Sequence, residues 1–138
     1  MFGDNLRGLQ HIGVPVSNID ASKAFYHRLG FEEVMARDLP VEGGAIHCAM
    51  MERQGLIMEL YQLVGADLDA VKQRGHGHVD HVALDVGDID AAWHTVLDAG
   101  FTPLEPAPVF LPFWEKGCKY FNILGPDGER IEFNQILT

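Results

Sequence analysis

An internal repeat is the feature that most constrains the fold of this 138-residue chain. The stretch LQHIGVPVSNIDASKAFYHRLGF, which starts at Leu9, returns as VDHVALDVGDIDAAWHTVLDAGF from Val79, with seven identities in 23 aligned positions at a shift of 70 residues. The later segments LIMELYQ and ERIEFNQ align at a shift of 73, which pairs Glu59 with Glu132 (132 − 59 = 73). A duplication of this length predicts two similar modules.

Each copy has the pattern of a strand, a helix and three further strands. The opening stretch alternates as a strand does, and the following helix is bounded by an Asp at the predicted N-cap (Asp20, Asp90) and a Gly at the predicted end (Gly30, Gly100). The helices are predicted at about residues 21–29 and 91–99. The further strands are predicted at about 32–37, 45–52 and 56–62, and at about 101–104, 118–124 and 129–136.

The predicted fold class is α+β. Two βαβββ modules, at about residues 7–64 and 78–138, are joined by a linker helix at about residues 65–77. A four-stranded sheet with a helix on one face leaves its other face bare, so the modules are expected to pack as one domain over residues 1–138. We therefore expect a curved eight-stranded mixed sheet around a metal-containing cleft.

Four polar residues stand out within these strands: His11, Glu59, His81 and Glu132. In each strand the apolar neighbours point to the opposite face from the polar residue. Buried imidazoles and carboxylates need a partner or a metal, and a mixed nitrogen and oxygen set suits one divalent Ni, Zn, Co, Fe or Mn ion. Two open positions would take a small-molecule substrate with adjacent oxygens, and either Glu59 or Glu132 could act as the catalytic group that moves a proton.

The chain resembles the vicinal oxygen chelate superfamily, which includes glyoxalase I, methylmalonyl-CoA epimerase, extradiol dioxygenases and bleomycin resistance proteins. The resemblance rests on QHIGVPVSNIDASKAFY, LIMELYQ, HVDHVALDVGDIDAA and GPDGERIEFNQ, which together cover most of the chain. It implies a metal site at the four residues named above and a homodimer. The first hypothesis is a metal-dependent lyase or isomerase of the glyoxalase I (lactoylglutathione lyase) type, moving a proton next to a metal-chelated carbonyl. The alternatives are an epimerase-like isomerase, an extradiol-type dioxygenase and a drug-sequestering resistance protein.

Some positions depart from both enzyme subfamilies. Glyoxalase I has an Arg and an Asn that bind glutathione, and this chain has Pro15 and Leu63 at the corresponding positions. The epimerase family usually has Gln at the position of Glu59, and its catalytic Glu on the third strand corresponds approximately to His47. The choice between the two subfamilies therefore stays open.

Other residues are candidates for substrate binding. His47 could enter the cleft as a general acid or base, or be a hydrogen-bonded core residue. The long irregular segment from Pro103 to Lys119 contains Phe113, Trp114 and Lys119, which could form a pocket wall with a cation for an anionic substrate. The alternative for this segment is a subunit contact.

Composition excludes several partners. The formal charge of −10 and the lack of a Lys/Arg cluster argue against nucleic acids. No apolar run approaches the roughly 20 residues that cross a bilayer, so we expect no membrane insertion and a cytoplasmic location. The two cysteines, Cys48 and Cys118, are interpreted as packing thiols.

Overall fold

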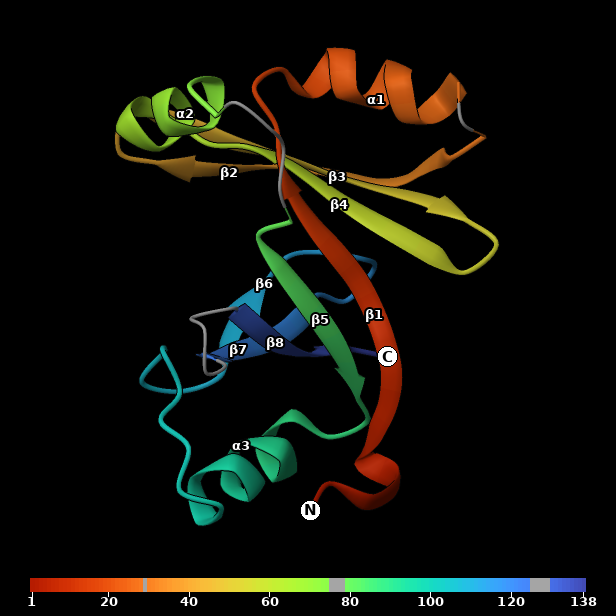
Figure 1. Ribbon diagram of the computed structural model, residues 1–138. Helices are drawn as coiled ribbons and strands as arrows, with labels where there is room; N and C mark the ends of the chain where they lie inside the picture. Colours follow the sequence, from red (N-terminus) through yellow and green to blue (C-terminus); the bar gives the residue numbers. More distant parts are fainter. Residues whose placement is uncertain (29, 75–78, 125–129) are drawn as a thin grey trace. The chain divides into compact units, whose positions relative to one another are not determined.

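The computed structural model describes residues 1–28, 30–74, 79–124 and 130–138 (Figure 1). Across these residues the chain forms eight strands, three α-helices and one short 3-10 helix. They are η1 (Gly3–Asn5), β1 (Leu6–Pro15), α1 (Ile19–Arg28), β2 (Glu32–Val41), β3 (Gly44–Arg53), β4 (Leu56–Gln62), α2 (Gly65–Lys72), β5 (His81–Val86), α3 (Ile89–Asp98), β6 (Val109–Leu111), β7 (Cys118–Leu124) and β8 (Arg130–Ile136). The strand order is β2-β3-β4-β1-β5-β8-β7-β6, with parallel and antiparallel neighbours, which confirms the predicted mixed α+β sheet.

The chain divides into two compact units. We call residues His11–Asp80 the N-terminal unit, and residues Met1–Gln10 together with His81–Thr138 the C-terminal unit. Strand β1 crosses this division, because Leu6–Gln10 belong to the C-terminal unit and the strand continues from His11 in the N-terminal unit. The predicted linker helix is α2, which is shorter than predicted, and the expected linker residues 75–77 lie outside the described residues.

In the N-terminal unit, β1 pairs with β4 in parallel, and β3 pairs with both β2 and β4 in antiparallel fashion. The core beneath α1 contains Val16, Ile19, Phe31, Ala49, Met51 and Leu60. Met58 packs against the same core, so the residues on either side of Glu59 face α1, as the alternation predicted.

The C-terminal unit repeats this arrangement. Strand β5 pairs with β8 in parallel, and β7 pairs with β8 and β6 in antiparallel fashion. Its core contains Val86, Ile89, Ala92, Val96, Phe121 and Phe133. Ile131 packs against this core together with Trp93 of α3, so both neighbours of Glu132 face the α3 side of the sheet.

Both helices begin two residues earlier than predicted. The Asn18 side chain accepts a hydrogen bond from the Ala21 amide at 3.0 Å, and the Asp88 side chain accepts one from the Ala91 amide at 2.9 Å. The predicted caps Asp20 and Asp90 were therefore wrong, and both lie inside the first turn. The buried residues Ile19 and Ile89 directly precede them. Packing of these two side chains into the core favours a helix that begins two residues earlier.

The glycines predicted to follow the two helices are confirmed, although α3 ends at Asp98, one residue earlier than predicted, and residue 29 lies outside the described residues. Gly30 and Gly100 adopt φ values of 93° and 84°, the left-handed conformation that glycine accepts without the strain imposed by a side chain. The amides of Phe31 and Phe101 then donate to carbonyls of the last helical turn, at 3.1 Å and 3.0 Å. Each helix is thus turned back into its sheet at an equivalent position of the repeat.

A glutamine in the last strand of each unit holds the start of the helix. Gln62 Oε1 accepts from the Ile19 amide at 2.8 Å, and Gln135 Oε1 accepts from the Ile89 amide at 2.9 Å. These amides belong to the first helical turn and have no partner within the helix. Gln62 lies three residues after Glu59, and Gln135 lies three residues after Glu132. The repeat therefore keeps the glutamine that holds the helix together with the carboxylate of the same strand.

The strand predicted at 101–104 was wrong, because the corresponding strand is β6, Val109–Leu111. Prolines at positions 103, 106 and 108 interrupt this segment, and proline has no amide hydrogen for a strand ladder. Leu104 N and the Glu105 side chain instead bond to the main chain of Asn122 in β7. No described helix is long and apolar enough to cross a membrane.

Candidate metal centre

Equivalent strand registers place a His and a Glu together in each unit. Gly13 is the ladder partner of Glu59 in the parallel β1–β4 pair, and Ala83 is the partner of Glu132 in the parallel β5–β8 pair. In each case the His lies two residues before the ladder partner, as His11 or His81, and therefore on the same face as the Glu. The repeat seen in the sequence is thus also a repeat of side-chain position.

In the N-terminal unit, His11 and Glu59 form a close pair. His11 Nε2 lies 3.5 Å from Glu59 Oε2. The imidazole is fully buried, whereas the Glu59 side chain keeps 13% of its surface exposed. A buried imidazole and a partly exposed carboxylate are thus held at a separation that donors around one metal ion adopt, roughly 3–4 Å for bond lengths of about 2.0–2.2 Å.

In the C-terminal unit, His81 and Glu132 form the equivalent pair. His81 Nε2 lies 3.3 Å from Glu132 Oε2, with 7% and 9% of their side-chain surfaces exposed. The other carboxylate oxygen, Glu132 Oε1, accepts a hydrogen bond from Asn134 Nδ2 at 2.7 Å. Both oxygens of Glu132 therefore have a nitrogen neighbour.

Burial raises the pKa of Glu132 above its ordinary value of 4.5, and the charge of Glu105 raises it further. His81 and the Asn134 hydrogen bond act in the opposite direction, because both favour the charged carboxylate. Desolvation is the largest of these influences. A positive charge beside Glu132 would remove the cost of keeping the buried carboxylate ionised.

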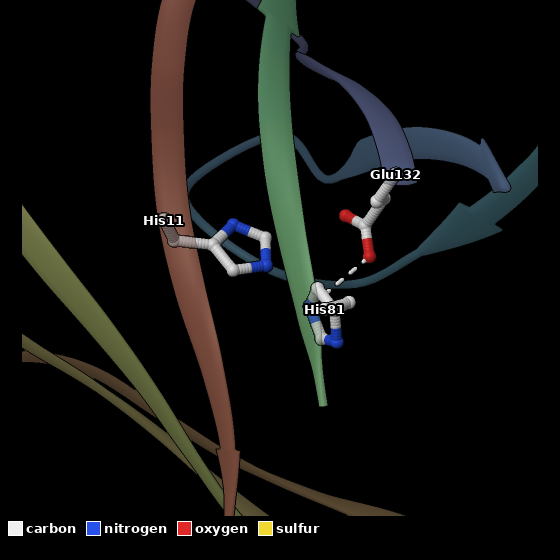
Figure 2. A group of neighbouring side chains, drawn as sticks. All are labelled: His11, His81 and Glu132. Atoms are coloured by element: carbon white, nitrogen blue, oxygen red, sulfur yellow. Dashed lines mark ion pairs between the residues drawn. The ribbon is translucent and has the colours of Figure 1, made fainter. Parts of the chain in front are cut away.

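His11 joins His81 and Glu132 in a group of three buried side chains. His11 directly follows Gln10, the last β1 residue of the C-terminal unit. One ligand atom from each of the three lies within 4.8 Å of the others. Figure 2 shows the His11 imidazole, from β1, near His81 and Glu132, which come from β5 and β8. The structure thus brings three of the predicted ligands together, and Glu59 adjoins them through its contact with His11.

The donor set of this group fits a divalent first-row metal. Two imidazole nitrogens and a carboxylate oxygen are suitable ligands for Zn, Ni, Co, Fe or Mn, whereas Mg and Ca prefer oxygen donors alone. All three residues are buried, with relative exposures of 0%, 7% and 7% for His11, His81 and Glu132. Burial of this much polar surface without a hydrogen-bonding or metal partner would be unfavourable.

Three buried polar residues of the C-terminal unit, which were not predicted from the sequence, are linked to Glu132 directly or through one another. Gln10, Asn122 and Asn134 are all buried, and Asn122 is the ladder partner of Glu132 on β7. Asn122 Nδ2 donates to Glu105 Oε1 at 2.7 Å. A signal was present in the sequence, since Asn134 lies two residues after Glu132 and so shares its face of the strand.

The structure does not bring His47 to the face that carries Glu59. His47 is the ladder partner of Gln62 in the β3–β4 pair, and Met50 is the ladder partner of Glu59. His47 and Met50 are three residues apart on β3, so their side chains point to opposite faces of the sheet. His47 therefore faces the α1 side, where its Nδ1 lies 2.6 Å from Asp38 Oδ1.

Cys48 is buried, and desolvation, with smaller contributions from Glu59 and Asp38, raises the pKa of its thiol to about 12. This Cys is protonated at neutral pH, as expected of a packing thiol.

The other predicted substrate residues lie in different places. Phe113 is buried, with 3% of its surface exposed. Lys119 is the ladder partner of Gln135, so it shares the α3 face and not the face of Glu132. Trp114 has a φ of 65°, which is unusual for a residue with a side chain, and it lines a cavity of about 450 Å³ together with Ile136. Ile136 is on the Glu132 face of β8, so Trp114 adjoins that face.

Comparisons with known proteins agree with this architecture. Residues 8–133 match the model of the Glyoxalase/Bleomycin resistance protein/Dioxygenase superfamily. The uncharacterized protein YwbC of Bacillus subtilis (strain 168) is 32% identical over 134 residues, which cover 92% of this chain and 96% of that protein.

Solved structures share the fold at lower identity. Methylmalonyl-CoA epimerase from Mycobacterium tuberculosis is 20% identical with a TM-score of 0.78, over 97% of this chain and 91% of that one. A Streptomyces coelicolor methylmalonyl-CoA epimerase variant in complex with 2-nitronate-propionyl-CoA is 23% identical with a TM-score of 0.76, over 96% and 99% of the two chains. Since the family model spans nearly the whole sequence, the chain belongs to the Glyoxalase/Bleomycin resistance protein/Dioxygenase superfamily.

Proposed function

We propose that this protein is a metal-dependent isomerase or lyase that moves a proton at a carbon next to a carbonyl group. The observation that carries the proposal is the buried group of His11, His81 and Glu132, with Glu59 in contact with His11. A divalent ion bound by these residues would polarise a carbonyl oxygen and stabilise the enolate that forms when the neighbouring carbon loses its proton. The cytoplasmic location and the homodimer stay predictions.

The two carboxylates have different roles in this proposal. Glu132 is the fixed ligand, because Asn134 holds its Oε1 at 2.7 Å while its Oε2 faces His81 at 3.3 Å. Glu59 is the group that removes and returns the proton. Its side chain is more exposed than that of Glu132, 13% against 9%, which supports access to a substrate carbon. His11 contacts Glu59 and orients its carboxylate.

The substrate class is a small carbonyl compound with a second oxygen close enough to bind the same ion. Two kinds fit this description: acyl thioesters with a carboxylate at the next carbon, as in the methylmalonyl-CoA named for the epimerases, and hemithioacetals, the substrates of glyoxalase I. Both reactions begin with the loss of a proton beside an oxygen-bearing carbon. The same ligand set could serve either, so substrate recognition is decided by other residues of the pocket.

The test is metal analysis followed by a proton-exchange assay. The protein is stripped of metal, reloaded separately with Ni, Zn, Co, Mn or Fe(II), and mixed in D₂O with methylmalonyl-CoA or with the hemithioacetal of methylglyoxal and glutathione. Proton NMR then measures deuterium entry at the reacting carbon. We expect exchange that requires added metal with one of the two substrates. Tight metal binding without exchange in either substrate would contradict the proposed function.

A second candidate function is ring-opening dioxygenase chemistry. The observation that favours it is the composition of the three-residue group, since two His and one carboxylate with open positions form the usual ligand set of non-haem Fe(II) oxygenases. A Glu59→Ala variant separates the two candidates. Retention of Fe(II) together with oxygen uptake on a catechol would favour the dioxygenase, whereas no oxygen uptake together with loss of the proton exchange seen in the wild type would favour the isomerase with Glu59 as the proton carrier.

A further inference from the structure

A chain of two side-chain amides ends on the carboxylate of Glu132. Gln10 Nε2 lies 2.8 Å from Asn134 Oδ1, and Asn134 Nδ2 lies 2.7 Å from Glu132 Oε1. Gln10 and Asn134 are buried, with 7% and 3% of their surfaces exposed. All three residues belong to the C-terminal unit, in β1 and β8.

A main-chain carbonyl fixes the direction of this chain. The same Gln10 Nε2 also lies 3.2 Å from the main-chain oxygen of Asn134, which can only accept a hydrogen bond. The NH₂ end of Gln10 must therefore face Asn134, so Asn134 presents Oδ1 to Gln10 and Nδ2 to Glu132. Rotation of the Asn134 amide by 180° would set its oxygen against the carboxylate and its NH₂ against that of Gln10. Both contacts would be unfavourable.

We propose that Asn134 is a positioning residue for Glu132 and that Gln10 sets the orientation of Asn134. This inference rests on the proposed metal-dependent function. By occupying Oε1, the Asn134 donor fixes the rotation of the carboxylate and leaves Oε2 as the ligand atom on the His81 side, where it lies 3.3 Å from Nε2. Hydrogen bonds to ligating carboxylates orient them in this way in metalloproteins.

The repeat supports an assignment that is specific to Glu132. The positions equivalent to Asn134 and Gln10 hold Tyr61 (134 − 73) and Asp80 (10 + 70), so the N-terminal unit does not carry two amides at these positions. The amides are therefore not a general requirement of the βαβββ module. They accompany the carboxylate that the proposed function treats as the fixed ligand.

The experiment measures Co²⁺ affinity by calorimetry and the visible spectrum of bound Co²⁺, with circular dichroism as a check on folding. The variants are Asn134→Ala, Asn134→Asp, Gln10→Ala and the double variant of Gln10→Ala with Asn134→Ala. Loss of such a partner typically weakens metal binding by about 10–100-fold. We expect a loss in that range for Asn134→Ala, a larger loss for Asn134→Asp, which replaces the donor with a second carboxylate, and an altered Co²⁺ spectrum in both.

Gln10→Ala should give a smaller loss, and the double variant should bind no worse than Asn134→Ala, because Gln10 acts through Asn134. The matched control is Gln135→Ala, which removes a neighbouring amide that bonds Ile89 N and Gly87 O. It should lower the melting temperature while the Co²⁺ affinity and spectrum stay those of the wild type.

Wild-type affinity and spectrum in Asn134→Ala, or equal losses in Asn134→Ala and Gln135→Ala, would overturn the positioning role. The proposed function fails separately, through the absence of proton exchange in a wild-type protein that binds metal. A wild-type protein that binds no divalent ion would overturn both.

Discussion

The two His/Glu pairs have nearly the same geometry but different surroundings. His11–Glu59 and His81–Glu132 arise from the same strand register, with nitrogen–oxygen distances of 3.5 Å and 3.3 Å. Glu132 also receives a hydrogen bond from Asn134, and the position equivalent to Asn134 beside Glu59 holds Tyr61. The duplicated backbone therefore fixes where the ligands lie, while the residues next to them have diverged. In the proposed function, this difference is what lets Glu132 be a fixed ligand and Glu59 a proton carrier.

The largest expected effect is the loss of an imidazole. His11→Ala and His81→Ala each remove a buried nitrogen donor. Both should weaken metal binding by more than the roughly 10–100-fold that is typical when a residue hydrogen-bonded to a metal ligand is lost. Metal analysis of the purified variants and calorimetric titration measure the loss. Full occupancy in both variants would disprove the ligand set and with it the equivalence of the two pairs.

The next effect separates the two carboxylates. In Glu59→Gln, deuterium exchange into the substrate should fall by about 10²–10⁴-fold, the usual contribution of a general base. The metal affinity of Glu59→Gln should fall less than that of Glu132→Gln, because Glu132→Gln removes the charge of the fixed ligand. Exchange rates and metal affinities measured side by side provide the check. If both variants lose affinity and exchange in the same proportion, the assignment of different roles is wrong.

A smaller effect concerns pH and the metal-free protein. Burial raises the pKa of Glu132 above 4.5, so the folded state keeps a proton that the unfolded state has already released. The resulting stability is fully present below the unfolded pKa and is lost as the pH rises through the folded value. The melting temperature of the metal-free protein should therefore fall as the pH rises from the unfolded pKa of Glu132 to its folded pKa. Glu132→Gln should reduce the slope of melting temperature against pH.

The control for this pH measurement is Glu42→Gln, which changes an exposed Glu of the N-terminal unit. It should leave the slope of melting temperature against pH as in the wild type. A slope that is equally steep in Glu132→Gln would mean that burial of this carboxylate does not determine the pH dependence.

The smallest effect tests a feature that the two units share. Gln62→Ala and Gln135→Ala each remove the acceptor for the first amide of a helix, and each should destabilise the protein by about 1 kcal/mol. Gln135→Ala should cost more, because Gln135 Nε2 also donates to Gly87 O at 2.9 Å. Urea unfolding and hydrogen exchange at the Ile19 and Ile89 amides provide the measurement. An unchanged exchange rate at these amides would show that the glutamines do not anchor the helices.

The sequence predicted the parts of the fold that the repeat determines. Alternation placed Leu60 and Phe133 in the two cores and Glu59 and Glu132 on the opposite face, because side chains in a strand alternate strictly between its two faces. Gly30 and Gly100 marked the helix ends because a left-handed residue strongly favours glycine. These signals are local, so they can be read without knowledge of the tertiary structure.

Other features depend on contacts between distant segments. Gln10 and Asn134 are 124 residues apart, and no local pattern indicates that their amides meet. His47 was a candidate for the Glu59 face, but the observed pairing of β3 with β4 sets it on the α1 face. The short β6 could have been anticipated in part, since Pro103 lies inside the strand predicted at 101–104.

The passage of β1 from one unit to the other has a consequence for dissecting the gene. A cut at the apparent repeat boundary, before Val79, would yield a downstream fragment that lacks the first ten residues of its own unit. That fragment would carry His81, Glu132 and Asn134 but not Gln10, the amide that orients Asn134. Half-length fragments are therefore poor surrogates for an ancestral single module, and a circular permutant that begins at His81 and ends at Asp80 would keep every strand while joining the original termini.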